Sequence, residues 1–459
     1  MIETQLEYLQ NDLNEVLTAF NLSDDVKVKH LLTKTENKLV NTIVINGKSY
    51  AYGNLIHDFG DEIVEKRLIK RFAKISLYKA LSLNLNVSLP WGSLTGIRPT
   101  KLAYSLLEEN GEFYDYFINT FKVSEEKTEL TAKIIETQKG IYEKNPDNTD
   151  FFIFVPFCPS RCNYCSFISQ DIKSAKMHID EYIDALIKEI NASSFLIRKL
   201  RSIYIGGGTP VALSDRQLEK ILNAVDKINT GVEYTVEAGR PDRITKENLK
   251  ILKDHNVTRI CINPQSFNDK TLKAIGRFHT ANDVIEKYEM AKNDFIVNMD
   301  LIAGLNNETF DDFAYSINKA IELDPDNVTI HTLSIKKGSY LAETTSRLSD
   351  NDVIKMVDYA HKRLTESGYN PYYLYRQKYM AGNLENTGYS KPDKECVYNV
   401  DVMEEISQNI ANGSCAISKA VSDDFSRIER VASPKDVPTY LAKLDKIIID
   451  KNNLFKNNR

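Results

Sequence analysis

Apolar residues near the N-terminus recur every three or four positions from Ile2 to Leu17, a spacing that places them on one face of a helix. Two β-rich runs follow, residues 39–45 and 49–52, and the Asn-Gly dipeptide between them is typical of a hairpin turn. A long helical pattern then covers residues 61–83. This order of elements predicts a small α+β domain at the N-terminus.

After a polar stretch at residues 144–148, short apolar runs alternate with helical stretches such as residues 174–199 and 214–228. The apolar, β-branched runs cover residues 151–157, 203–205, 234–236, 259–262, 296–302 and 328–335. Strands that alternate with helices predict a parallel sheet with right-handed crossovers, and six such units form a (β/α)6 partial barrel. The chemistry of such a barrel lies at the C-terminal ends of its strands.

These patterns divide the chain into three predicted domains. Residues 1–148 form the N-terminal α+β domain, whose role the sequence does not indicate, and residues 149–345 form the α/β core. Residues 346–459 mix helical patterns with an aromatic-rich segment, residues 369–379. We expect them to form a mostly helical domain that covers the substrate side of the barrel.

The composition limits the class of protein. Hydrophobic residues make up 42% of the 459 residues, which is enough for a sizeable core. The net charge of −5 argues against a general nucleic-acid binder, which needs a concentrated basic field. No uncharged apolar run approaches the roughly 18 residues of a membrane span, and the acidic start of the chain is unlike a signal peptide. We therefore expect a cytoplasmic protein.

Three of the six cysteines, Cys158, Cys162 and Cys165, are closely spaced directly after a predicted strand. Thiolates in a C-x3-C-x2-C spacing on one loop can hold three corners of an iron–sulfur cube and leave one iron open for chemistry. A zinc site would need four ligands, and no fourth cysteine or histidine lies nearby in the sequence. Zinc and three unrelated buried cysteines are the alternatives to a cluster.

Further polar or glycine-rich positions follow the predicted strands. Residues 206–210 read Gly-Gly-Gly-Thr-Pro, and consecutive glycines allow a backbone to approach a ligand closely. Glu237 ends the third strand, where a carboxylate can bind a hydroxyl pair or an amine. Asp300 lies in an otherwise apolar strand and must be paired or functional, because an isolated buried charge is costly. His331 is interpreted as a core histidine, with a catalytic role as the alternative.

The cysteine spacing, with an aromatic residue just before Cys165, resembles the signature of the radical S-adenosylmethionine (SAM) superfamily. The resemblance implies a 4Fe-4S cluster on the three cysteines, whose open iron binds the amine and carboxylate of SAM. One electron from the reduced cluster then cleaves SAM to methionine and a 5′-deoxyadenosyl radical. A reductant such as flavodoxin or ferredoxin is implied as a partner.

The segments 91–96, 373–378 and 428–431 extend the resemblance to one branch, the oxygen-independent coproporphyrinogen III oxidase family and its HemZ-like members. By that resemblance, SAM contacts fall on Phe152, Tyr164, Gly207, Gly208, Thr209, Glu237, Gln265, Arg277 and Asp300. The implied reaction is the oxidative decarboxylation of two propionates of coproporphyrinogen III to vinyl groups, which gives protoporphyrinogen IX. We expect the protein to act as a monomer.

The implied tetrapyrrole substrate carries four carboxylates, so basic groups are expected to line its cleft. The candidates are Arg98, Lys336, Lys337, Arg376 and Lys378, each with a solvated surface charge as the alternative. The sequence singles out no catalytic residue.

The sequence also departs from the family pattern. Phe167 stands where some relatives carry a fourth cysteine. Residues 410–416 contain fewer glycines than the corresponding segment of the coproporphyrinogen III oxidase family. These departures leave two other functions open. One is a heme-binding chaperone, and the other is a different radical SAM enzyme that cleaves SAM and acts on a tetrapyrrole without decarboxylating coproporphyrinogen.

Overall fold

A computed structural model describes most of the chain, namely residues 2–22, 26–35, 38–55, 62–96, 98–165, 170–175, 177–334, 350–377 and 380–457. The chain divides into two compact units. Unit 1 comprises Met1–Ala132 with Arg376–Glu385, and unit 2 comprises Lys133–Tyr375 with Asn386–Arg459. This division differs from the three domains expected from the sequence, because most of the C-terminal part packs with the barrel. None of the helices in the described ranges is long and apolar enough to cross a membrane.

Unit 1 contains a four-stranded sheet in the order β1 (Ile2–Thr4), β2 (Val28–Lys34), β3 (Lys38–Ile45) and β4 (Lys48–Leu55). The predicted hairpin is confirmed: β3 and β4 pair antiparallel, and Asn46 and Gly47 both have positive φ, as the tight turn requires. The predicted start of the first helix is wrong. Ile2 pairs with Val28 in a parallel ladder, and the helical turn begins only at Glu7.

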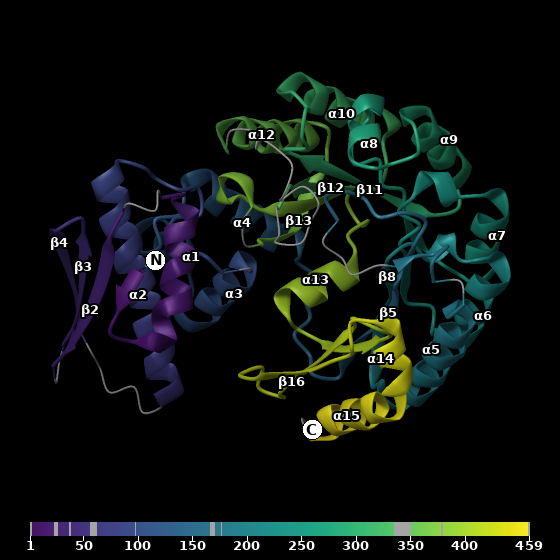
Figure 1. Ribbon diagram of the computed structural model, residues 1–459, viewed down its shortest axis with the longest axis horizontal. Helices are drawn as coiled ribbons and strands as arrows, with labels where there is room; N and C mark the ends of the chain where they lie inside the picture. Colours follow the sequence, from purple (N-terminus) through teal and green to yellow (C-terminus); the bar gives the residue numbers. More distant parts are fainter. Residues whose placement is uncertain are drawn as a thin grey trace. The chain divides into compact units, whose positions relative to one another are not determined.

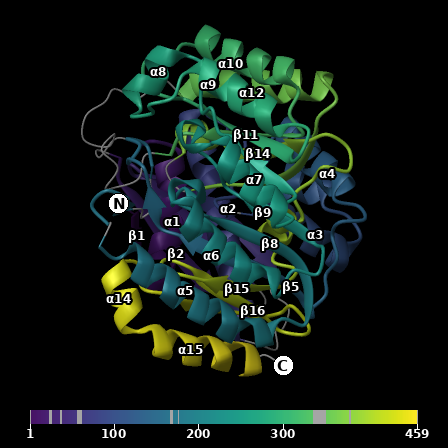
Figure 2. The same cartoon turned by 90° about the vertical axis from the view of Figure 1, so that its right-hand side faces the viewer.

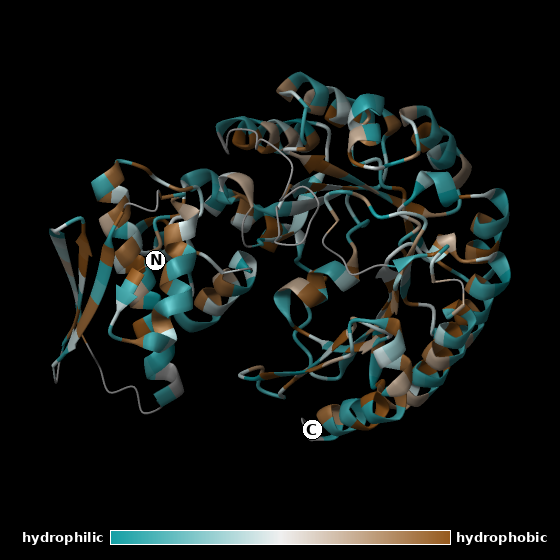
Figure 3. Ribbon diagram, viewed as in Figure 1, coloured by the Kyte–Doolittle hydropathy of each residue, from teal (hydrophilic) through white to brown (hydrophobic). Residues whose placement is uncertain are grey.

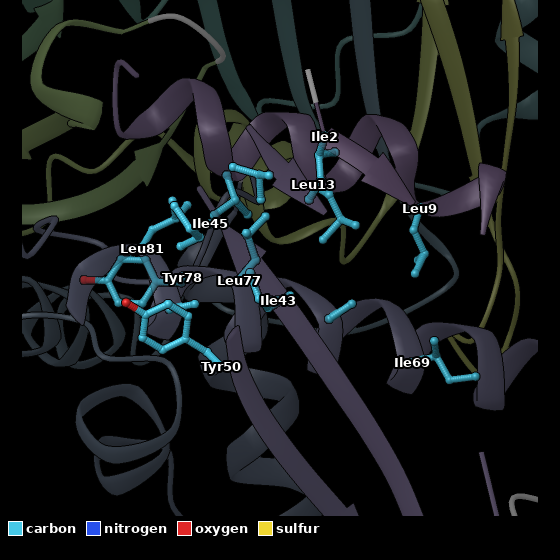
Figure 4. Packing of buried hydrophobic residues seen from close by; sticks show 14 of the residues in the cluster. Ile2, Leu9, Leu13, Ile43, Ile45, Tyr50, Ile69, Leu77, Tyr78 and Leu81 are labelled. Atoms are coloured by element: carbon cyan, nitrogen blue, oxygen red, sulfur yellow. The ribbon is translucent and has the colours of Figure 1, made fainter. Parts of the chain in front are cut away.

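The core of unit 1 forms where helices pack on this sheet. These helices are α1 (Gln10–Ala19) and α2 (Glu62–Leu85), and the unit also holds α3 (Pro99–Asn110) and the start of α4 (Glu125–Thr137). Figure 4 shows side chains of one apolar cluster, to which Leu9, Leu13, Ile43, Leu77 and Leu81 belong. The helical spacing of Leu9, Leu13 and Val16 explains this packing, because it presents one apolar face to the sheet.

Six adjacent parallel strands form the centre of unit 2, in sequence order along the sheet (Figure 1). They are β5 (Asn148–Val155), β8 (Lys199–Gly207), β9 (Glu233–Val236), β10 (Arg259–Cys261), β11 (Ile296–Ala303) and β12 (Asn327–Thr332). Each matches a predicted apolar run, so the (β/α)6 partial barrel is confirmed. Residue 335, at the end of the sixth run, lies outside the described residues.

Helices follow these strands and lie outside them. They are α5 (Ile179–Ser193), α6 (Asp215–Asp226), α7 (Lys246–Asp254), α8 (Asp269–Ala274), α9 (Ala281–Ala291), α10 (Phe310–Leu323) and α12 (Asp350–Glu366). Figure 3 shows hydrophobic colouring along the inner strands and hydrophilic colouring on much of the outer helical ring. Capping boxes at Ser214, Thr245, Thr280 and Thr309 begin four of these helices, which fixes where each crossover turns back along the sheet.

The C-terminal part extends the barrel sheet at both edges. At one edge β14 (Asn386–Ser390) pairs antiparallel with β12 and with β13 (Asn370–Tyr375). At the other edge β15 (Gln408–Asn412) pairs parallel with β5 and is followed by β16 (Ile417–Val421) and β17 (Ile428–Ala432). The helices of this part are α13 (Val397–Glu404), α14 (Val437–Ala442) and α15 (Leu444–Asn457). The sequence predicted the helices but not these strand pairings.

A buried ion pair fastens the C-terminal helices to the barrel. Lys451 on α15 donates to Glu189 on α5 at 2.6 Å and to Asn412 at 2.8 Å, and the Lys451 and Glu189 side chains are 2% and 0% exposed. Glu189 also accepts from the Tyr440 hydroxyl at 2.6 Å and from the Gly413 N–H at 2.8 Å. Figure 2 shows α14 and α15 beside α5, so one carboxylate joins three helices to the end of β15.

Replacement of Lys451 by Met should lower the free energy of unfolding by about 3–5 kcal/mol, because it leaves the buried Glu189 charge without its cation. Urea denaturation followed by circular dichroism measures this change. The matched control is Lys446→Met on the same helix, whose ion pair with Asp450 is solvent-exposed and contributes little. Equal stability losses in the two variants would contradict the assigned role of Lys451.

Candidate functional site

The three clustered cysteines lie on the segment that leaves the C-terminal end of β5. Cys158 ends the short strand β6 (Phe157–Cys158), which pairs with β7 (Gln170–Asp171). Cys162 is buried, Cys158 and Cys165 are partly exposed, and none of the six cysteines forms a disulfide. The strand-end position predicted from the sequence is therefore observed, and none of the three thiols is consumed in a disulfide.

The surroundings of the cysteines suit thiolate ligands of an iron–sulfur cluster. The Thr209 hydroxyl lies 3.7 Å from Cys158 Sγ, and Arg240 Nη1 lies 3.8 Å from Cys162 Sγ, so donors face two of the sulfurs. Among the described residues, no three His, Cys, Asp or Glu side chains converge as they would around a single metal ion. A cubane does not require such convergence, because each cysteine binds a different iron. The residues therefore fit a cluster.

The glycine-rich segment 206–210 packs directly on the backbone that leads to the cysteines. The Gly208 N–H donates to Val155 O at 2.7 Å, and the Thr209 N–H donates to Phe157 O at 2.8 Å. A Cβ atom on Gly208 would lie 2.5 Å from Phe157 O, which is closer than any side chain can approach. Glycine at this position is thus required for the segment to hold the cysteine loop.

Glu237 follows β9 and faces the same glycine segment. Its carboxylate accepts from the Tyr204 hydroxyl at 2.6 Å and from the Gly207 N–H at 3.3 Å. Burial raises the pKa of Glu237, and these two hydrogen bonds oppose the shift. The arrangement leaves a carboxyl group poised beside bare glycine backbone, where it can accept further hydrogen bonds from a ligand.

Asp300 is paired, as its place in an apolar strand requires. It accepts from Asn298 Nδ2 at 2.8 Å, and its Oδ2 lies 3.6 Å from His331 Nε2. Burial opposes ionisation of Asp300, but the adjacent His331 and the hydrogen bonds to the carboxylate lower its pKa overall. His331 Nδ1 also lies 3.4 Å from the Tyr375 hydroxyl. His331 therefore belongs to the polar site and is not an isolated core histidine.

Gln265, Tyr164 and Arg277 connect the strand ends to the cysteine loop. The Gln265 N–H donates to Asp300 O at 2.8 Å, with Gln265 in a left-handed conformation at φ +66°. Arg277 donates to the Tyr164 hydroxyl at 2.9 Å and to Gly239 O at 3.1 Å. The predicted residues thus fall into two linked groups, one around the cysteines and the other around the two carboxylates.

Phe152 belongs to an aromatic wall inside unit 2. Its ring stacks on Tyr398 with centroids 5.9 Å apart, and Tyr398 stacks on Tyr204 at 4.4 Å. Tyr398 comes from α13 of the C-terminal part and Tyr204 from β8. Sequence reasoning did not assign Tyr204 and Tyr398 to the site. For Tyr204, the sequence offered one signal, an aromatic residue near the end of a barrel strand. For Tyr398 it offered none, because only the tertiary packing brings that residue to Phe152.

One predicted carboxylate-binding residue, Arg376, is not available to a substrate. Its guanidinium is buried in unit 1, donates to backbone carbonyls of Leu94 and Asn383, and lies 5.4 Å from the Trp91 ring. Its role is structural, because it fixes the segment between β13 and β14. Arg98 lies just before α3 of unit 1. The candidates Lys336, Lys337 and Lys378, and the position of Phe167, lie outside the described residues.

The fold and the cysteine site define the class of protein. Residues 152–320 match the family model of the radical SAM superfamily. The protein is therefore a radical SAM protein, and its cofactors are a 4Fe-4S cluster and SAM.

Comparison with curated relatives shows which family within the radical SAM class the chain resembles. The chain is 35% identical to the oxygen-independent coproporphyrinogen-III oxidase-like protein HemZ of Bacillus subtilis, across 83% of this chain and 81% of that protein. It belongs to that family of HemZ-like proteins. It is also 36% identical to the heme chaperone HemW of Lactococcus lactis, across 48% of this chain and 60% of that one. The structure of coproporphyrinogen III oxidase (HemN) from Escherichia coli shares the fold, with a TM-score of 0.54, 21% identity, and coverage of 70% of this chain and 72% of that one.

A further buried carboxyl group, that of Glu308, supports the loop around Gln265. Glu308 accepts from the hydroxyl of Ser266 at 2.5 Å and is 1% exposed. Burial raises the pKa of Glu308 to about 7. The native protein therefore binds a proton between pH 5 and 7 that an unfolded chain has already released.

Because only the native state holds this proton, the free energy of unfolding falls as the pH rises from 5 to 7. Glu308 alone accounts for about 2 kcal/mol of this decrease. Glu308→Gln should remove that part of the pH dependence, since the amide does not titrate. Urea unfolding of the wild type and the variant at pH 5 and pH 7 tests this. An identical pH dependence in both proteins would show that Glu308 is not protonated in the native state.

The three clustered cysteines should hold the cluster together. Cys162→Ala should abolish the iron and acid-labile sulfide bound after anaerobic reconstitution, together with the visible absorbance of the cluster. Cys415→Ala is the matched control, because Cys415 lies on the turn between β15 and β16 and should leave the iron content unchanged. Full iron content in the Cys162→Ala protein would refute the ligand assignment.

Proposed function

We propose that the protein catalyses the oxidative decarboxylation of two propionate side chains of coproporphyrinogen III, giving protoporphyrinogen IX. The observation that carries the proposal is the similarity to the coproporphyrinogen-III oxidase-like HemZ protein across 83% of the chain. That similarity extends well beyond residues 152–320, the part that matches the superfamily as a whole. It therefore includes regions outside the cluster and SAM site, where a substrate is selected.

In this proposal Cys158, Cys162 and Cys165 hold the cluster, which supplies the electron that cleaves SAM. The SAM contacts are Phe152, Tyr164, Gly207, Gly208, Thr209, Glu237, Gln265, Arg277 and Asp300. The glycine C=O groups and the carboxyl group of Glu237 can accept hydrogen bonds from the amino group of SAM, and paired Asp300 suits a ligand with hydroxyl groups. Tyr164, held by Arg277, keeps the segment beside Cys165 in place.

The substrate would lie against the aromatic wall of Phe152, Tyr204 and Tyr398, because its apolar pyrrole rings can pack on aromatic side chains. For each propionate, hydrogen abstraction at the β-carbon, followed by loss of CO2 and transfer of one electron to an external one-electron acceptor, would leave a vinyl group. Exclusion of water by the packed aromatic side chains protects the radical during this step. The reaction is proposed to take place in the cytoplasm, in a monomer, with flavodoxin or ferredoxin as the reductant.

Anaerobic turnover with coproporphyrinogen III, SAM and a strong reductant should yield protoporphyrinogen IX, CO2, methionine and 5′-deoxyadenosine, identified by mass spectrometry. The Cys162→Ala protein should form none of these products, which controls for chemistry by free iron or reductant. Cleavage of SAM that leaves coproporphyrinogen III intact would rule out the proposed reaction while leaving the radical SAM class in place.

A second candidate function is a heme chaperone, which the similarity to the HemW protein of Lactococcus lactis supports. That similarity covers 48% of this chain and therefore leaves much of it without a counterpart. Titration with heme separates the two functions. A tight, stoichiometric Soret band without turnover of coproporphyrinogen would favour the chaperone. Altered heme masses after incubation with SAM and reductant would instead indicate a different tetrapyrrole-acting radical SAM enzyme.

A further inference from the structure

Arg240 reaches from the end of β9 into the cysteine loop, and neither the sequence motifs nor the family resemblance marked it. Its Nη1 atom donates to Ser160 Oγ at 3.1 Å and lies 3.8 Å from Cys162 Sγ. The other side of the same guanidinium binds Asp242, with Nε at 2.9 Å and Nη2 at 3.2 Å from the two carboxylate oxygens. One planar group therefore spans the carboxylate and the cysteine loop.

This guanidinium is nearly excluded from solvent, with 3% of Arg240 exposed. A buried cation is costly unless it is paired and hydrogen-bonded, so its position calls for negative partners. Asp242 supplies one negative charge, and Asp242 is also approached by Arg243. A second buried cation, Arg277, lies on the same side and binds Gly239 O next to Arg240. The positive charge around the cysteine loop thus exceeds what Asp242 alone can balance.

The missing negative charge is present once a cluster is bound. A 4Fe-4S core of charge +2 with three thiolates carries a net charge of −1, and uptake of one electron makes it −2. A buried cation that donates to a ligand sulfur stabilises the second state more than the first, since net charge and hydrogen bonds to the sulfurs set the reduction potential of such clusters.

We propose that Arg240 is a positioning residue for the cluster, which holds Cys162 through a charged N–H···S contact and favours the reduced state that cleaves SAM. The fork geometry of arginine is needed, because Asp242 and the cysteine loop lie on opposite edges of the side chain. Asp242 fixes the guanidinium plane and partly offsets its charge. The two residues therefore have opposite effects on the potential.

The inference rests on the assignment of the cluster to the three cysteines and does not depend on the substrate. The experiment is a redox titration of the anaerobically reconstituted full-length protein without SAM or coproporphyrinogen, followed by electron paramagnetic resonance of the reduced cluster. The wild type is compared with Arg240→Gln and Asp242→Asn. Arg243→Gln is the matched control, because Arg243 lies in the same segment and contacts Asp242 at 3.7 Å but is partly solvent-exposed.

At the midpoint potential of the wild type, half of the wild-type cluster is reduced. The reduced fraction should fall below one half in Arg240→Gln, rise above one half in Asp242→Asn, and stay near one half in Arg243→Gln. If Arg240 and Asp242 acted only in folding, their replacement would not shift the reduction potential of the cluster in opposite directions. If Arg240→Gln binds no cluster, the reduced fraction in Asp242→Asn tests the inference by itself: a value above one half supports it, and an unchanged value contradicts it.

Unchanged potentials in Arg240→Gln and Asp242→Asn, or shifts of both in the same direction, would overturn the inference. Failure of the proposed decarboxylation gives a different result from failure of the role proposed for Arg240. A wild-type protein that is reduced and cleaves SAM, but leaves coproporphyrinogen III unchanged, contradicts only the substrate assignment and leaves the role of Arg240 standing.

Discussion

The site depends on the close approach of two backbones, the glycine segment after β8 and the chain that leaves β5. Hydrogen bonds from Gly208 and Thr209 to Val155 and Phe157 hold the two together, in a space that admits no Cβ atom on Gly208. The same glycine segment presents Gly207 to Glu237 on its other side. A single contact therefore sets both the start of the cysteine loop and the spacing between that loop and Glu237.

Charge is distributed unequally around this contact. Guanidinium groups of Arg240 and Arg277 lie on the cysteine side, where thiolates and an iron–sulfur cluster need compensation. Carboxylates of Glu237 and Asp300 lie on the other side, each held by neutral donors or by His331. A ligand with a cationic centre and hydroxyl groups is matched to the second side. The separation of sign would orient such a ligand with respect to the three cysteines.

The C-terminal part of the chain completes the site by joining the barrel rather than by lying over it as a separate helical layer. Strand β15 pairs with β5, and the buried Glu189–Lys451 pair fixes the helices that follow. Between the two edges of the sheet, α13 carries Tyr398 onto Phe152. Because β13, β14 and β15 are paired with barrel strands or with one another, the aromatic wall is tied to the strands that carry the cysteines and carboxylates.

Local signals in the sequence determined the six strand–helix units, the hairpin at Asn46-Gly47, the strand-end position of the three clustered cysteines and the carboxylates at strand ends, because periodicity and spacing act over short distances. They did not determine that Ile2 joins a sheet, that Arg376 is buried against Trp91, or that Tyr398 stacks on Phe152. Those contacts join residues far apart in the chain, and an arginine or tyrosine carries no local mark of its distant partner. Arg240 shows the same limit: no local signal marked it, and only the fold brought its guanidinium to Cys162.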